Sequence, residues 1–218
     1  MNQTLWEQLV KQFSNRWEDL LAAASIHIEL VLLSMLIAIV VGVPLGIVVT
    51  RIPALKSWVI GGAGILQTIP SLALLGFMIP IFGIGMKTAI AALFLYSLLP
   101  IIRNTYTGIK EVDQATIEAA KGMGMTDAQL LFKVELPLSL AVIMAGIRTS
   151  TVINVGTATL AAFIGGGGLG DFIFLGISRN MDALILLGAV PAAILAVFLD
   201  YLLGVTEKWT TPRGLKKS

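Results

Sequence analysis

The chain has 218 residues and a mass of 23.2 kDa, the length of one domain, yet 56% of its residues are hydrophobic and only 13% are charged. Soluble globular chains carry about 25% charged residues, so this composition predicts a protein held in a membrane by apolar helices and excludes a soluble dinucleotide-binding fold. The absence of cysteine excludes disulfides and thiolate metal sites. The net charge of +2 does not imply a nucleic-acid partner, because loop lysines and arginines of membrane proteins set orientation.

The first predicted element is an amphipathic helix over residues 1–23. Apolar residues, among them Leu9, Phe13, Trp17 and Leu20, recur at steps of three and four, while charged residues fill the gaps. This spacing is typical of a helix that lies in the membrane interface with its apolar face toward the lipids. We expect it either to anchor the chain at the membrane surface or to pack against the first span.

Five apolar segments follow, and they approach the length of about 20 residues that a membrane crossing needs. The expected spans are residues 30–50, 57–86, 88–107, 139–164 and 183–206. The second segment is long for one crossing and short for two, and Pro70 predicts a break in its middle. The expected fold class is therefore an all-α integral membrane protein with five transmembrane helices, whose membrane domain covers residues 24–206 and is followed by a tail over 207–218.

The basic residues between these spans predict the orientation of the chain. With the amino terminus outside, ten lysines and arginines fall on the inner side and four on the outer side. Such a bias follows the positive-inside rule. We therefore expect a cytosolic carboxyl terminus, a cytosolic loop over residues 108–137, and a glycine-rich outer loop over residues 165–180.

The cytosolic loop has the pattern of two short helices joined by a glycine turn. Asp113 can cap the first helix, and Gly122 with Gly124 lets the chain reverse. A capping box starts the second helix at Thr126, and Pro137 is expected to stop this helix before the next span. A short, folded loop with small exposed side chains is typical of an element that docks into a groove on another protein.

The spacing of residues in this loop resembles the signature of permease subunits of type I ABC importers, which is EAA, three residues, G, nine residues and I-x-L-P. The match is complete except that Val134 replaces the isoleucine. The resemblance implies five spans, an outer amino terminus, and a coupling helix that inserts into a cleft of a separate ATPase. The residues expected to carry the coupling are Glu118, Ala119, Ala120, Gly122, Gly124, Leu136 and Pro137.

Four further stretches resemble the osmoprotectant branch of that family, whose substrates are glycine betaine, carnitine, choline and related compatible solutes. They cover residues 67–71, 99–109, 145–151 and 163–171. The resemblance implies a prokaryotic cell membrane and three partners: a cytosolic ATPase, an extracytoplasmic substrate-binding protein, and a second permease that is either a copy or a paralogue. The chain carries no G-x-x-x-x-G-K-[ST] motif, so ATP and magnesium are expected on the ATPase and no cofactor on this chain.

Polar residues inside the predicted spans allow two interpretations. They either line a pathway for a zwitterion or form hydrogen bonds and close contacts between helices. They are Gln67, Thr68 and Ser71 around the Pro70 break, and Ser150, Asn154 and Thr157 on the fourth span.

The glycine-rich outer segment formally satisfies a dinucleotide-binding pattern. Gly165, Gly167 and Gly170 have the G-x-G-x-x-G spacing, and Gly168 lies between them. The pattern indicates a nucleotide only between a strand and a helix, and here it follows a membrane span. We therefore expect a flexible loop at the exit of the translocation path, where a gate must open.

Four ionisable residues lie within or near the lipid. Arg148 on the fourth span is expected to form a buried lock, either with Asp200 on the fifth span or with helix-end carbonyl groups. His27 and Glu29 lie near the outer interface and are expected to be solvated.

Other functions remain open at this point. A permease of the same type could carry another small solute such as an amino acid. A secondary transporter would need coupling acids in the membrane, for which Asp200 alone is thin support. A membrane enzyme or scaffold would use the Glu118 loop itself, but this loop lacks histidine, cysteine and a spaced carboxylate pair.

Overall fold

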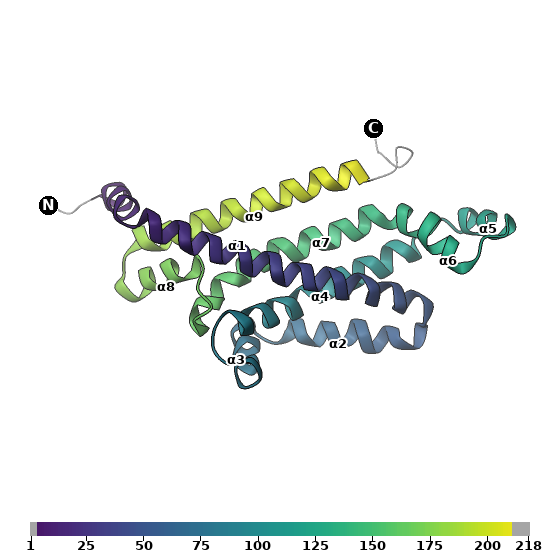
Figure 1. The fold of residues 1–218 in the computed structure, drawn as a ribbon, viewed down its shortest axis with the longest axis horizontal. Coiled ribbons are helices and arrows are strands. Elements are labelled where there is room, and N and C mark those ends of the chain that lie inside the picture. Colours follow the sequence, from purple (N-terminus) through teal and green to yellow (C-terminus); the bar gives the residue numbers. More distant parts are fainter. Residues whose placement is uncertain (1–3, 211–218) are drawn as a thin grey trace.

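A computed structural model describes residues 4–210 and shows long helices that run side by side along one axis (Figure 1). Residues 1–3 of the predicted amphipathic segment and 211–218 of the predicted tail lie outside the described part. In chain order the elements are α1 (Leu5–Arg51), the 3-10 turn η1 (Pro53–Leu55), α2 (Lys56–Thr68), α3 (Ser71–Phe82), α4 (Met86–Lys110), α5 (Gln114–Gly122), α6 (Asp127–Leu130), the π-helical turn η2 (Leu131–Glu135), α7 (Leu136–Ala158), the 3-10 turn η3 (Thr159–Ile164), α8 (Gly170–Arg179) and α9 (Asp182–Thr210).

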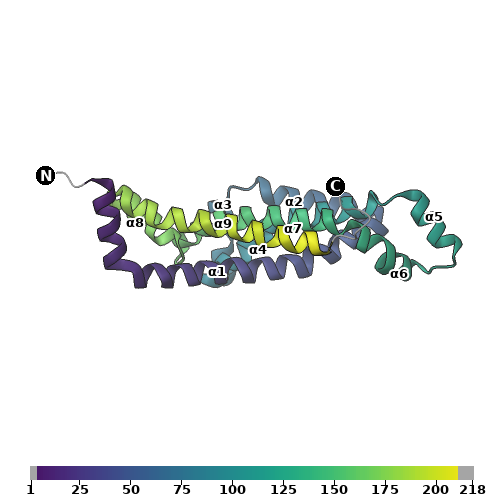
Figure 2. The ribbon, with the colours of Figure 1, turned by 90° about the horizontal axis from the view of Figure 1, so that it is seen from above.

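The amphipathic segment and the first span form a single helix, α1. The helix starts at a capping box, in which the Thr4 side chain accepts from the Glu7 backbone N–H and the Glu7 carboxylate accepts from the Thr4 N–H. Arg16 has non-helical dihedral angles (φ −133°, ψ 19°), and the first turns bend away from the rest of α1 there (Figure 2). The bend thus lies before residue 23, the expected boundary, and α1 continues through that position.

The predicted break in the second apolar segment is present. Helices α2 and α3 meet at 105° across Ile69 and Pro70. Ile69 adopts an extended conformation (ψ 128°), as expected of a residue that precedes proline.

Within residues 4–210, four helical stretches are long and apolar enough to cross a bilayer: α1, α4, the stretch from Asp127 to Ile164, and α9 up to Lys208. The number reaches five only if the bent pair of α2 and α3 makes one crossing. The expected all-α membrane fold is confirmed, whereas the expected count of five spans depends on this bent pair.

The second loop helix does not stop at Pro137, contrary to the sequence prediction. Helix α6 passes through η2 directly into α7, and Pro137 lies in the first turn of α7. The wide π turn shifts the hydrogen-bond register, since the Leu136 N–H donates to the Leu131 carbonyl group five residues back. The helix therefore accommodates a residue that has no N–H to donate.

The glycine-rich outer segment over residues 165–180 was expected to be a loop, but most of it forms helix α8 (Gly170–Arg179). Phe172 on α8 is buried in a cluster with Leu184 and Leu187 of α9, which explains why these residues form a helical hairpin. Asn180 ends α8 in a left-handed conformation (φ 50°) and allows the chain to reverse into α9.

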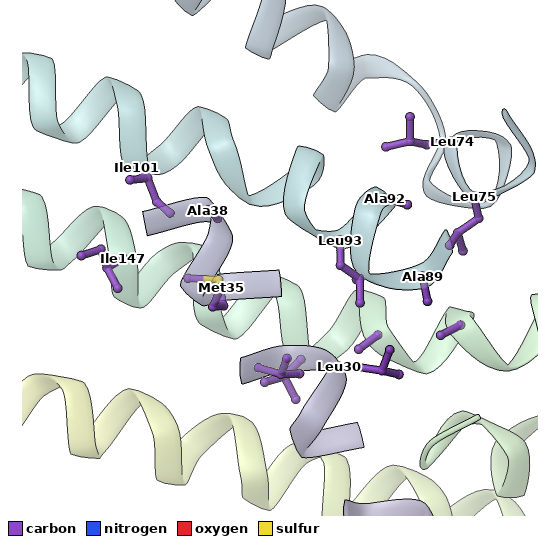
Figure 3. Close-up of a cluster of buried hydrophobic side chains, with 14 of the residues drawn as sticks. Leu30, Met35, Ala38, Leu74, Leu75, Ala89, Ala92, Leu93, Ile101 and Ile147 are labelled. Carbon is purple, nitrogen blue, oxygen red and sulfur yellow. The ribbon is translucent and has the colours of Figure 1, made fainter. Parts of the chain in front are cut away.

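The core lies where α1, α4 and α7 meet. Figure 3 shows Met35 of α1, Leu93 of α4 and Ile147 of α7 in one buried cluster. Gly46, four residues after Gly42, brings α1 against α4, because a Cβ atom at Gly46 would lie 2.5 Å from the Thr105 Cβ. Small residues at this spacing allow close helix contact inside a membrane, where lipid competes for apolar surfaces.

Candidate functional site

The loop between α4 and α7 has the local structure that its sequence predicts. The Asp113 carboxylate caps α5 by accepting from the Thr116 N–H at 3.1 Å. Thr126 and Gln129 form the reciprocal capping box of α6. Between the two helices, Gly124 adopts a left-handed conformation (φ 80°) in open space, so its role in the fold is conformational.

The signature residues of this loop divide between its surface and its interior. Glu118 and Ala119 are exposed, whereas Ala120 is buried. Two large apolar side chains are also exposed, Met123 at 72% and Phe132 at 68%. Neither residue was predicted from the sequence, although apolar residues within a polar loop are a signal for a protein interface.

The remaining signature residues belong to helix ends. Gly122 is the last residue of α5 and is exposed. Leu136 and Pro137 are half-buried in the first turn of α7. The signature therefore spans the whole path from the tip of the loop to a membrane helix.

In the middle of α7, Arg148 is paired with two carboxylates of α9. Its Nε and Nη2 atoms donate to the two oxygens of Asp200 at 3.0 and 2.9 Å, and its Nη1 atom donates to Glu207 at 2.8 Å. The expected Arg148–Asp200 pair is thus present, and Glu207 was missed because it lies beyond the predicted end of the span. Seven residues separate the two acids, so they share one face of α9.

The Arg148 cluster is not buried within one chain, contrary to the expectation. The side chains of Arg148 and Asp200 are 32% and 41% exposed. A pocket of about 340 Å³, also lined by Tyr201 and Gly204, lies beside them. Exposed charged side chains on membrane-spanning helices are costly against lipid, so this cluster is expected to face water or another protein.

The polar residues of the fourth span serve the contact between helices. The Ser150 hydroxyl donates to the Ser97 carbonyl group at 2.8 Å, and the Asn154 amide donates to the Ser97 hydroxyl at 2.7 Å and accepts from Ser34 at 3.2 Å. Both side chains are fully buried between α1, α4 and α7, which contradicts a pathway role for them. Thr157 donates to the Ile153 carbonyl group of its own helix.

Around the Pro70 break, side chains hold the bent helices onto α4. Gln67 donates to the Tyr96 carbonyl group at 3.0 Å, and the Tyr96 hydroxyl donates to the Ile69 carbonyl group. The Ile69 carbonyl group lies at the break, and the Tyr96 carbonyl group lacks its usual helical partner because Pro100, four residues later in α4, has no N–H. Thr68 donates to a carbonyl group one turn back and is exposed, and Ser71 starts α3.

The glycine-rich segment is a tightly packed turn, and the expected flexible loop is wrong. Gly165, Gly167 and Gly168 all have positive φ angles, and a Cβ atom at Gly170 would lie 1.8 Å from the Thr159 carbonyl oxygen. No strand occurs in the part of the chain that the structure describes, so the dinucleotide pattern has no structural support.

His27 is fully buried beside this turn, whereas we expected it to be solvated. Its Nε2 atom donates to the Val155 carbonyl oxygen at 3.1 Å. At the change from α7 to η3, the Thr159 N–H donates to Gly156, so the Val155 carbonyl group lacks its usual partner in the helix. His27 therefore satisfies a backbone group that the helix leaves free. Among residues 4–210, no group of three His, Asp or Glu side chains could hold a metal ion.

Comparison with known proteins identifies the family. Residues 38–213 match the family model described as binding-protein-dependent transport system inner membrane component. The chain is 51% identical to the glycine betaine/carnitine/choline transport system permease protein OpuCB of Bacillus subtilis, with 91% of each chain covered. It is 46% identical to the carnitine transport permease protein OpuCB of Listeria monocytogenes (97% of each) and 45% identical to the osmoprotectant import permease protein OsmW of Salmonella typhimurium (87% of this chain and 91% of OsmW).

Solved structures show the same fold. The inward-facing MetNI methionine ABC transporter superposes with a TM-score of 0.79 at 25% identity, over 88% of this chain and 96% of that one. A structure described as an amino acid ABC transporter with histidines superposes with a TM-score of 0.78 at 18% identity, over 95% of this chain and 99% of that one, which supports the fold alone. The chain is thus a multi-pass membrane permease that belongs to the family of inner membrane components of binding-protein-dependent transport systems.

Proposed function

We propose that this chain is the permease subunit of an ATP-driven importer of quaternary-ammonium compatible solutes such as glycine betaine, carnitine and choline. The observation that carries the proposal is the 51% identity, over 91% of the chain, to a permease named for these three solutes. Relatives named for choline, carnitine and osmoprotectant transport support the same solute class. The signature loop supports ATP coupling, because its two capped helices stand clear of the bundle (Figure 1).

The loop is the proposed docking site for a separate cytosolic ATPase. Its tip offers small side chains around Glu118 and the exposed apolar side chains of Met123 and Phe132, a combination that suits insertion into a cleft. This assignment places the loop and the end of α9 in the cytosol, and the amino terminus and α8 outside, where a substrate-binding protein delivers solute. ATP and magnesium then reside on the ATPase.

A second permease, either a copy or a paralogue, completes the proposed pathway. The half-exposed ion pairs of Arg148 support this arrangement, because a charge cluster that faces lipid is costly and one that faces protein or water is not. Thr68 and Thr157 keep surfaces outside the buried core, so they remain candidates for the pathway, with Gly165 near its outer end.

The proposed mechanism is alternating access. ATP binding closes the ATPase dimer, the loop follows this motion, and the spans reorient to accept solute from the binding protein. ATP hydrolysis then resets the inward-facing state. Each state is favoured only by as much as ATP and solute bind it better than the other state.

The test is solute uptake into proteoliposomes that contain the permease with its ATPase and binding protein. Labelled glycine betaine should accumulate with ATP inside and not without it, and unlabelled carnitine or choline should compete. Competition by methionine or histidine alone would favour an amino acid permease. Accumulation driven by an ion gradient without ATP would favour a secondary transporter and contradict the proposal.

A further inference from the structure

An ion pair joins the signature loop to the first membrane helix. Glu135 is the last residue of η2, and Arg51 is the last residue of α1. One Arg51 nitrogen donates to Glu135 Oε1 at 3.2 Å, and the other terminal nitrogen donates to Oε2, so the contact is bidentate. The Glu135 side chain is only 6% exposed, whereas that of Arg51 is 39% exposed.

A buried carboxylate is a costly choice for stability alone. Desolvation of the charge offsets much of the attraction, and apolar residues of similar volume often stabilise a fold as well or better. The best-attested use of a buried ion pair is to fix one arrangement of two elements against alternatives. Glu135 occupies the x of the I-x-L-P part of the signature, where any residue is allowed, so it is not one of the coupling residues assigned above.

The position of the pair in the fold is informative. The π turn η2 lies between the docking helices and α7, and a π turn is a local irregularity in a helix that recurs at functional sites. If the loop moved as a body, this turn would be able to bend and absorb the motion. Glu135 ends the turn, so its bond to Arg51 fixes the end nearest the membrane.

The other partner, Arg51, is attached to a rigid part of the bundle. Just before it, Gly46 brings α1 into close contact with Thr105 of α4. Just after it, the Lys56 ammonium of α2 lies 4.6 Å from the centre of the Tyr106 ring of α4. A displacement received at Arg51 therefore reaches α1, α2 and α4 together.

We propose that the Arg51–Glu135 pair is the anchor through which motion of the signature loop is passed to α1 and its neighbours, and that it stays closed throughout the transport cycle. This inference rests on the proposed function and makes Arg51 and Glu135 positioning residues. Without the pair, the loop follows the ATPase but the π turn absorbs part of the displacement. Loss of the pair should therefore reduce coupling more than docking or ATP hydrolysis.

The test compares solute transported per ATP hydrolysed in proteoliposomes of the whole complex. Glu135→Gln should co-purify with the ATPase and hydrolyse ATP, but its ratio of glycine betaine to ATP should fall about tenfold, within the range of measured coupling energies. The charge swap Arg51→Glu with Glu135→Arg should recover most of the ratio. The matched control is Lys87→Gln, which removes an exposed charge from the first turn of α4, outside the loop, and should keep the parent ratio.

A covalent replacement tests whether the pair stays closed. The chain contains no cysteine, so Arg51→Cys with Glu135→Cys can be joined by a short bifunctional thiol reagent without background reaction. The joined protein should transport at close to the parent ratio, and the unjoined double variant should be as poorly coupled as Glu135→Gln. If Glu135→Gln fails to assemble, comparison of the joined and unjoined double variants still tests the anchor.

Two results would overturn the anchor. One is a parent ratio in Glu135→Gln, and the other is loss of transport once the two positions are covalently joined. Either result can be interpreted only if the parent complex shows ATP-driven uptake. Absence of such uptake in the parent would contradict the proposed function itself, so the two failures are distinguishable.

Discussion

Two glycine turns lie at opposite ends of this bundle, and they use glycine for different physical reasons. In the signature loop, Gly124 is in open space and is needed for its left-handed backbone. In the turn before α8, Gly170 is needed because the Thr159 carbonyl group leaves no room for a side chain. The loop can therefore move as a folded unit, whereas the other turn is part of the packed core.

The largest effect should come from the packed turn. Gly170→Ala places a methyl group within 1.8 Å of a backbone oxygen, so the cost should reach or exceed the ~3 kcal/mol upper range of ordinary overpacking. The variant should yield little monodisperse protein on size-exclusion chromatography in detergent. Gly122→Ala, at a helical glycine with no atom within 4 Å, is the matched control and should behave like the parent. Equal yields for the two variants would contradict the distinction between the two turns.

At the loop, the effect should fall on function and spare insertion. Gly124→Pro cannot adopt the observed φ of 80°, because the proline ring fixes φ near −65°. The variant should reach the membrane at the parent level and lose ATP-driven uptake of glycine betaine. Gly124→Asn is the matched control, since asparagine tolerates the left-handed conformation better than other residues. Normal uptake by Gly124→Pro would remove the basis for assigning coupling to this loop.

A smaller effect is expected from the exposed apolar residues beside the turn. Met123→Ser with Phe132→Ser should weaken the affinity for the ATPase by about 30-fold or more, because buried anchors at an interface each contribute on the order of 1–2 kcal/mol. The thermal midpoint of the permease alone should not change. If the ATPase is retained at the parent level, these side chains are not part of the interface.

The smallest effect concerns pH at the packed turn. Partial burial raises the pKa of the Asp171 carboxyl, which lies on α8 beside Gly167. The folded state then holds a proton more tightly than the unfolded state, so this residue favours folding at pH below about 4 and that contribution is lost as pH rises through the raised pKa. Asp171→Asn should therefore stabilise the protein slightly more at pH 7 than at pH 4. An equal difference in melting temperature between Asp171→Asn and the parent at pH 4 and at pH 7 would contradict this expectation.

Local patterns predicted much of the fold. The apolar runs located the long helices, Pro70 located the break, and the caps at Asp113 and Thr126 located the loop helices. Each of these features depends on residues that are close in the sequence. Hydropathy failed at α8, because this short helix is stabilised by packing of Phe172 against α9.

Contacts between distant residues account for what the sequence did not predict. His27 appeared to be a solvated residue near an interface, but it satisfies a carbonyl group that is freed where α7 becomes a 3-10 turn. Arg51 looked like a charge that closes a span, and its partner Glu135 lies 84 residues away. One of the two acidic partners of Arg148 was predicted. Asp200 lies within the predicted fifth span, whereas Glu207 lies one residue beyond its predicted end.

The most direct measurement is the initial rate of glycine betaine uptake by proteoliposomes that contain the permease, its ATPase and its binding protein, with and without ATP. Uptake that requires ATP, competes with choline and carnitine, and disappears in Gly124→Pro while the protein remains inserted is the predicted result. Uptake that persists without ATP, or that is unchanged in Gly124→Pro, would contradict the assignment of this chain as an importer permease coupled through its loop.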